Sequence, residues 1–166
     1  MATIDAQTAG GKNRVALLDV IANSEIGPAL LAIPETDNGY LVLVGATPQN
    51  PLTFSNFAKH PNIYNAQCGS TAAGRYQILY RWWVIYQKRL NLPDFSPLSQ
   101  DKYALQQFKE RGALPLIDAG NLQGALAKLN NIWASLPGSP YGQHTNSYAP
   151  LEAAYLAAGG TLSQGS

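Results

Sequence analysis

An apolar helix that ends in a carboxylate is the feature that most constrains this chain. Residues 13–25 read "NRVALLDVIANSE", and their apolar side chains recur at the spacing of one helix face. The apolar positions of this face are Leu17, Leu18, Ile21 and Ala22. Glu25 follows Ile21 by one helical turn, so it extends the same face, and Gly27-Pro28 ends the helix. The sequence therefore predicts a buried helix with a glutamate at its C-terminal end.

The position of Glu25 suggests a chemical role. A carboxylate on an apolar face is costly to desolvate, so it needs hydrogen-bond donors or must keep its proton. A carboxylic acid that keeps its proton near neutral pH can act as a general acid, which is what cleavage of a glycosidic bond requires. A glutamate near a helix end also commonly lies in water. Periodicity alone therefore leaves both interpretations of Glu25 open.

The rest of the chain predicts a mainly helical α+β domain with a small β-hairpin early in the sequence. Residues 39–57 combine β-rich and turn-rich segments, which indicates the hairpin. Five further helices are expected. The first begins at about 73–75 and runs to 90, the third covers 114–120 and the last covers about 149–158. The second begins at Pro97 after a Ser96 cap and ends before Gly112, and the fourth runs from an Asn121 cap to about Trp133. The expected organisation is a flexible arm over 1–11, a single domain over 12–160 and a tail over 161–166.

Charge and composition exclude several classes of function. Lys and Arg number 11 against 10 Asp and Glu, so no strong basic field favours nucleic acid. Cys68 is the only cysteine, and His60 and His144 lack ligand spacing, so we expect no metal site. No other cofactor is implied. The N-terminus has no signal-peptide core, and the apolar stretch 26–34 is shorter than the ~20 residues that span a bilayer, so no stable membrane insertion is expected.

Several long motifs together resemble one known family. They are "ANSEIG", "GYLVLVG", "FSNFAKHP", "STAAGRYQILYRWW", "SPLSQDKYALQQFKERGALPLIDAGNL" and "NIWASLPGSPYGQ", in that order along the chain. Together they closely resemble the phage lambda-type endolysins, which are lysozyme-fold enzymes classed as peptidoglycan lytic transglycosylases. The resemblance runs from about Arg14 to Gln143, with a weaker tail. It implies a lysozyme-like fold.

The resemblance also implies site residues. Glu25 falls on the catalytic glutamate, and Ser24 before it either orients the active-site helix or bonds its local backbone. The segment 73–77 falls on the saccharide groove. Its candidates for sugar contact are Tyr76 and Gln77, with Arg75 as a supporting residue or a structural ion-pair partner.

Further candidates lie outside that segment. Tyr141 and Gln143 fall on a loop that can close over the groove in the family. Tyr40 and Trp133 are expected either to touch sugar or, preferably, to pack in the core, and Trp82 and Trp83 are expected mainly in the core. One departure from the family is the apolar segment 26–34, which either packs against the body or faces a partner or lipid.

The expected reaction follows from the family. It cleaves the β-1,4 bond between N-acetylmuramic acid (MurNAc) and N-acetylglucosamine (GlcNAc), with 1,6-anhydro-muramoyl ends as product and Glu25 as acid and then base. A hydrolytic muramidase that uses Glu35 or Asp37 as a second carboxylate is an alternative. A non-catalytic glycan-binding module and a virion-associated protein are two others. By analogy we expect a monomer, made in the host cytoplasm, that reaches the periplasmic wall after a holin permeabilises the membrane.

Overall fold

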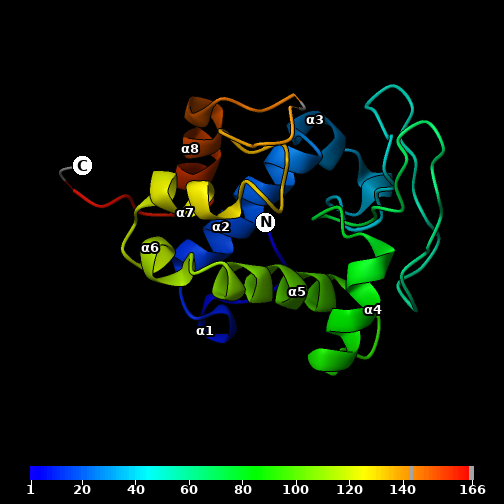
Figure 1. Ribbon diagram of the computed structural model, residues 1–166, viewed down its shortest axis with the longest axis horizontal. Coiled ribbons are helices and arrows are strands. Elements are labelled where there is room, and N and C mark those ends of the chain that lie inside the picture. The colour runs from blue at the N-terminus through cyan, green and yellow to red at the C-terminus, as the bar shows by residue number, and fades with distance from the viewer. Residues whose placement is uncertain (143, 165–166) are drawn as a thin grey trace. The chain divides into compact units, whose positions relative to one another are not determined.

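The computed structural model describes residues 1–142 and 144–164, which form two compact units. The helical unit contains residues 1–24 and the described residues from Ala104 onward, and the hairpin unit runs from Glu25 to Tyr103. Figure 1 labels the α-helices, which are α1 Ala6–Ala9, α2 Lys12–Glu25, α3 Pro28–Leu31, α4 Tyr80–Arg89, α5 Pro97–Glu110, α6 Leu114–Asp118, α7 Leu122–Leu129 and α8 Tyr148–Ala157. A 3-10 turn, η1 Pro34–Thr36, follows α3.

Helix α2 forms the core of the helical unit. The sequence predicted one inward face, but every residue from Val15 to Ala22 is buried, Asp19 included. A helix that is surrounded on all sides needs apolar residues all round, and the run "VALLDVIA" supplies them at seven of its eight positions. The caps predicted for two other helices are confirmed. Ser96 Oγ accepts from the Ser99 amide at 3.4 Å, and Asn121 Oδ1 accepts from the Gly124 amide at 2.9 Å.

Both chain ends are folded where the structure describes them. The expected flexible arm contains helix α1, which Asp5 caps by accepting from the Thr8 amide at 2.8 Å. Ile4 is 4% exposed, and the Ala2 amide donates to Asp19 at 2.7 Å. At the other end, the Thr161 amide donates to Asn13 Oδ1 at 3.0 Å. Helix α1, the burial of Ile4 and the bond from Ala2 to Asp19 therefore hold the N-terminal residues in place, where a flexible arm was predicted over 1–11.

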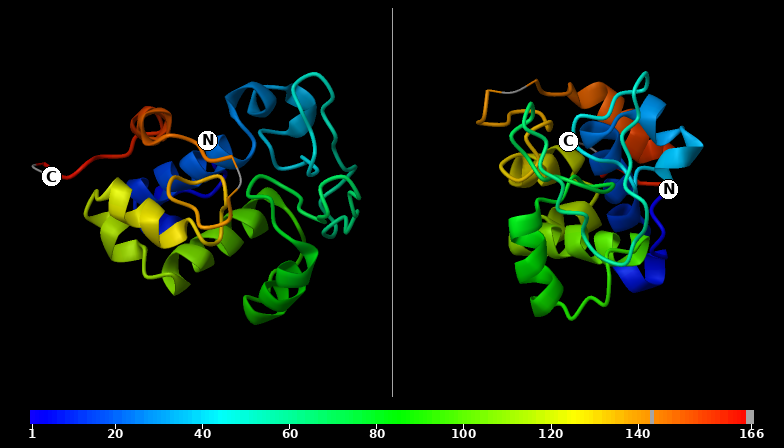
Figure 2. Two further views of the ribbon diagram at one scale, coloured as in Figure 1. Left: turned by 45° about the horizontal axis from the view of Figure 1, so that its top comes forward. Right: turned by 90° about the vertical axis from the view of Figure 1, so that its right-hand side faces the viewer.

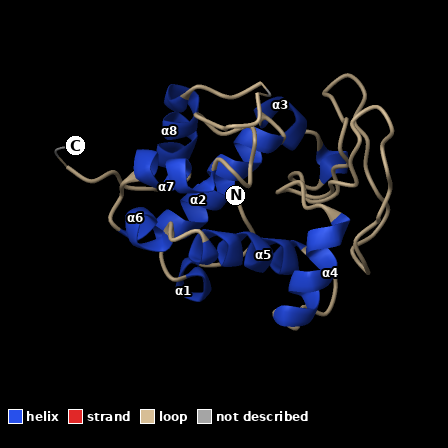
Figure 3. Ribbon diagram, viewed as in Figure 1, coloured by secondary structure: helices blue, strands red, loops and turns tan. Residues whose placement is uncertain are grey.

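The hairpin unit carries the β pairing. Val42 pairs with Thr53 and Thr47 with Asn50, which confirms a hairpin within 39–57. Ala73 pairs with both Leu43 and Ile78, so a second turn lies beside the first. The pairing consists of isolated bridges, and Figure 3 therefore draws these segments as loops; Figure 2 shows them as long excursions coloured cyan to green. Together with the helices, this is the mainly helical α+β arrangement that the sequence predicted.

Helix α4 begins later than expected. Residues 73–78 form a turn instead of the first helical turn, because Gly74 and Gln77 adopt left-handed backbone angles, with φ of +81° and +49°. Trp83 is 1% exposed and packs edge-on against Phe95 at 4.8 Å, as predicted for a core residue. Trp82 was predicted to be a core residue too, but it is 46% exposed, because the adjacent position on a helix faces a different direction.

Helix α7 ends earlier than expected, at Leu129, and residues 130–136 continue as turns. The stretch that contains Trp133 therefore lies in a loop and not in a helix. None of the helices in the described part of the chain combines the length and apolarity that crossing a membrane requires.

Candidate active site

Glu25 is the last residue of α2 and is half-buried. The residues before it are packed on all sides, whereas Pro28 and Ala29 after it are exposed. Gly27 has a φ of +89°, which redirects the chain, and Pro28 then begins α3. The carboxylate therefore lies where the chain passes from the core to the surface.

The apolar segment after Glu25 is only partly buried. Leu30 is 3% exposed, while Pro28, Ala29 and Ala32 are exposed. Leu31 and Ile26 lie over Gly39, where an added Cβ would approach their methyl carbons to 2.6 Å and 3.0 Å. Packing of segment 26–34 against the body of the protein was the favoured interpretation. It holds for part of the segment, whereas the other residues lie at the surface.

Ser24 is buried beside the glutamate. Its hydroxyl lies 2.7 Å from the Ser135 hydroxyl, and the Asn146 side-chain amide donates to it at 3.0 Å. The hydroxyl of Ser24 is therefore bonded to two residues of a distant loop. Neither Ser135 nor Asn146 was predicted from the sequence, because both lie in a Gly/Pro/Ser-rich loop whose pattern carries no signal of partners.

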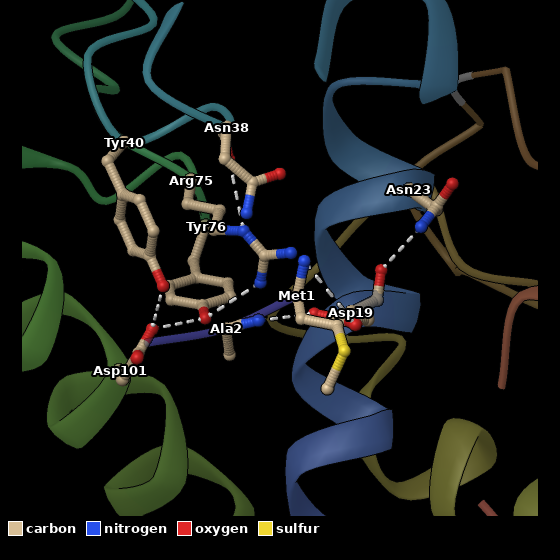
Figure 4. Close-up of polar contacts among 9 residues, drawn as sticks. All are labelled: Met1, Ala2, Asp19, Asn23, Asn38, Tyr40, Arg75, Tyr76 and Asp101. Atoms are coloured by element: carbon tan, nitrogen blue, oxygen red, sulfur yellow. Dashed lines mark hydrogen bonds and ion pairs between the residues drawn. The ribbon is translucent and has the colours of Figure 1, made fainter. Parts of the chain in front are cut away.

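The segment 73–77 is held by a buried polar network in the hairpin unit. Tyr40 and Tyr76 both donate their hydroxyl protons to Asp101 Oδ1, at 2.8 Å and 2.5 Å (Figure 4). Gln100 accepts from the Arg75 amide at 2.9 Å and donates to the Tyr40 carbonyl at 3.1 Å. Gln100 and Asp101 were not predicted from the sequence, because nothing in the pattern of helix α5 marks them as partners of a turn 25 residues earlier.

Two sugar-contact predictions are corrected by this network. Tyr76 is 0% exposed and Tyr40 is 2% exposed, so neither ring offers a surface to a ligand. Burial raises the pKa of Tyr76 well above its ordinary value, an effect that the Arg75 charge opposes. Tyr76 therefore stays protonated and serves as a hydrogen-bond donor inside the protein. For Tyr40, the structure agrees with the favoured alternative of core packing.

Arg75 has a structural position. It is 1% exposed, its Nε donates to the Asn38 carbonyl at 3.1 Å, and one terminal nitrogen donates to the Tyr76 hydroxyl at 3.1 Å. Its guanidinium also lies 5.4 Å from the Tyr40 ring centre and 5.6 Å from the Tyr76 ring centre. These contacts hold Arg75 inside the hairpin unit and give it a structural role.

Gln77 and Tyr141 remain candidates for sugar contact. Gln77 is half-buried, and its side-chain nitrogen donates to the Gly74 carbonyl at 2.8 Å, which stabilises the turn. Tyr141 is 56% exposed, and its hydroxyl donates to the Asn131 carbonyl at 2.8 Å, so its ring is held in one place while facing solvent. Gln143, predicted in the same loop, lies outside the described residues.

Trp133 is a core residue. It is 3% exposed and packs edge-on against Phe108, with ring centres 5.8 Å apart. This agrees with the favoured alternative and removes Trp133 from the candidates for sugar contact. The carboxylates of the alternative mechanism, Glu35 and Asp37, are both exposed, on η1 and directly after it.

Comparison with known proteins identifies the family. The sequence model of the Endolysin family matches residues 15–162. The chain is 47% identical to the endolysin of Escherichia phage lambda over 152 residues, covering 90% of this chain and 92% of that protein. It is 45% identical to the endolysin of Escherichia phage P2 over 158 residues, covering 90% of this chain and 94% of that protein.

The fold agrees with solved structures. Bacteriophage lambda lysozyme complexed with a chitohexasaccharide matches with a TM-score of 0.80 and 42% identity, over 98% of this chain and 99% of that one. A second structure of lysozyme from bacteriophage lambda matches with a TM-score of 0.78 at the same identity and coverage. The chain therefore belongs to the endolysin family and is a lysozyme-like, peptidoglycan-degrading enzyme of the phage lambda type.

Proposed function

We propose that this endolysin is a lytic transglycosylase that cleaves the β-1,4 bond between MurNAc and GlcNAc, with Glu25 as its single catalytic carboxylate. The observation that carries the proposal is the place of Glu25 at the end of the buried helix α2, inside the matched family region. The similarity to a lambda lysozyme that binds a chitohexasaccharide supports a glycan chain as the substrate.

The proposed reaction uses one proton donor twice. Glu25 donates its proton to the glycosidic oxygen, and the bond from that oxygen to the anomeric carbon of MurNAc breaks. The 6-hydroxyl oxygen of the same MurNAc then bonds to the anomeric carbon, and its proton passes to the Glu25 carboxylate. The products are a 1,6-anhydro end and a GlcNAc 4-hydroxyl, and the enzyme is restored. Because the attacking hydroxyl is tethered to the reacting sugar, the step needs no activated water.

Product analysis tests the proposal. Purified sacculi are digested in water enriched in oxygen-18, and the fragments are analysed by mass spectrometry. We expect anhydro ends without incorporated label. Reducing ends that carry the label would overturn the transglycosylase assignment in favour of hydrolysis.

Substitutions test the role of Glu25 in the same assay. Glu25→Gln keeps the size of the side chain and removes its acidic proton, so we expect a loss of roughly 10²–10⁴-fold in rate. Glu35→Gln and Asp37→Asn are matched controls, which should retain activity, and asparagine tolerates the φ of +48° at residue 37. Loss of activity in either control would support the two-carboxylate alternative. Substantial activity in Glu25→Gln would exclude Glu25 from the chemistry.

We further propose that the chain is a monomer that accumulates in the host cytoplasm and reaches the wall after a holin opens the membrane. Expression in a bacterial host is then expected to cause lysis only when the membrane is permeabilised, for example by co-expressed holin or chloroform. Lysis without permeabilisation, or a dimer in light scattering, would contradict the respective part of this proposal.

A further inference from the structure

Three polar residues enclose the C-terminal end of α2 within the helical unit. We call Ser24, Ser135 and Asn146 the α2 clamp. The Asn146 side-chain nitrogen lies 3.0 Å from the Ser24 carbonyl, 3.0 Å from the Ser24 hydroxyl and 3.3 Å from the Ser135 carbonyl. The two serine hydroxyls lie 2.7 Å apart. The clamp thus joins Ser24 to two residues that lie 111 and 122 positions later in the sequence.

The clamp also closes its own loop. The Asn146 backbone amide donates to the Ser135 carbonyl at 2.8 Å, so both ends of the 135–146 segment are joined next to Ser24. Ser24 itself is 8% exposed, and Ser135 and Asn146 are half-buried. Hydrogen bonds in such a shielded setting are stronger than in water. The clamp therefore attaches Ser135 and Asn146 to the end of α2.

The clamp acts on a carbonyl that helix geometry leaves unpaired. The last four carbonyls of an α-helix have no partner within the helix, and the Ser24 carbonyl is one of them. This carbonyl belongs to the peptide group that joins Ser24 to Glu25. Because that group is planar, holding the Ser24 oxygen also restrains the Glu25 amide nitrogen and its Cα, which belong to the same rigid unit. This plane and the helical backbone angles of Glu25, the last residue of α2, together set the direction in which its side chain leaves the backbone.

We propose that Asn146 is a positioning residue for catalysis: through the α2 clamp it holds the Ser24–Glu25 peptide group and thereby aims the Glu25 carboxyl. This inference rests on the proposed role of Glu25 as proton donor. Proton transfer to a glycosidic oxygen depends steeply on geometry, and a displacement of about 1 Å at a catalytic group can cost roughly 10²-fold in rate. Asn146 contributes through its amide donor and does not need to touch the substrate.

The test compares two asparagines of the same loop. Asn146→Ala removes the donor to Ser24, whereas Asn130→Ala removes a donor to the Pro137 carbonyl at 3.2 Å. Both substitutions delete a side-chain amide bonded to a loop carbonyl, but only the first reaches the end of α2. On solubilised peptidoglycan strands we expect Asn146→Ala to lower kcat by roughly tenfold or more with KM within about twofold, since positioning affects the chemical step. Asn130→Ala should leave both constants near those of the wild type.

Two further variants keep the test independent of folding. Ser135→Ala removes one hydroxyl of the clamp, and Ser135→Thr restores a hydroxyl, so we expect kcat to fall in the first and to recover in the second. Thermal unfolding is followed for every variant. If Asn146→Ala and Asn130→Ala lose the same activity in proportion to the same loss of Tm, or if kcat of Asn146→Ala is unchanged, the positioning role is wrong. If Glu25→Gln retains activity, the proposed function fails instead, so the two failures are distinguishable.

Discussion

The hydroxyl of Tyr40 donates a hydrogen bond of 2.8 Å to Asp101, and both side chains are almost completely buried. The same carboxylate oxygen accepts from Tyr76, and the Tyr76 hydroxyl in turn accepts from Arg75. This arrangement fastens the turn at residues 73–78 to helix α5. It gives the "AGRYQ" motif a structural explanation that does not involve sugar contact by its tyrosine.

Removing the Tyr76 hydroxyl tests that explanation. Tyr76→Phe leaves Asp101 and Arg75 with one partner fewer in a buried site. We therefore expect the free energy of unfolding, measured in urea, to decrease by about 1–3 kcal/mol. Tyr64 is 65% exposed, and Tyr64→Phe should leave stability unchanged. Well below Tm, folded Tyr76→Phe should retain its lytic rate. A strong loss of rate with no loss of stability would instead indicate that Tyr76 contacts the substrate.

A second prediction concerns the space at Gly74. A Cβ at this position would lie 2.2 Å from Gln100 Oε1, and the φ of +81° disfavours any side chain. Gly112 has a similar φ of +73° but open space around it. We expect Gly112→Ala to cost about 1–2 kcal/mol of unfolding free energy from backbone strain alone. Gly74→Ala should cost more, by about 1–3 kcal/mol from overpacking. Equal losses in the two variants, measured by urea unfolding, would show that Gln100 can move away.

The third prediction concerns pH and His60. This side chain is 3% exposed; its Nδ1 accepts from the Asn62 amide at 3.0 Å, and its Nε2 lies 2.7 Å from the Ile78 carbonyl. These partners suit a neutral ring with the proton on Nε2. Burial lowers the pKa of His60 from 6.5, an effect that the hydrogen bond to Ile78 partly opposes.

The lowered pKa of His60 determines how stability changes with pH. Below pH 6.5 the unfolded chain takes up a proton at this histidine before the folded chain does. The contribution of His60 to stability is therefore fully present above pH 6.5 and falls as the pH drops toward the lowered pKa of the folded state, by at most about 1.4 kcal/mol per pH unit. Urea unfolding between pH 7.5 and pH 5 should show this decrease in the wild type and in His144→Gln, where the replaced side chain is exposed. His60→Gln should be less stable at pH 7.5 and should lose that part of the pH dependence. An unchanged slope would contradict the prediction.

The sequence alone was sufficient for the elements whose signals are local. The apolar run before Glu25, the Gly-Pro pair that ends it, the caps at Ser96 and Asn121, and the family motifs all depend on short stretches of residues. Their physical basis is side-chain spacing, backbone freedom and hydrogen bonds over three or four positions, which a linear pattern records. These features were enough to predict the fold class and to select Glu25.

The tertiary structure decided the roles that depend on distant partners. Tyr76 and Trp82 look alike in sequence as aromatic residues of one motif, yet the first is buried by Asp101 and Tyr40 and the second is exposed. Asn146 lies in a loop without a pattern, and its proximity to Ser24 exists only in the folded chain. Burial and hydrogen-bond pairing between segments more than a hundred residues apart result from packing, and no local spacing encodes which atoms will meet.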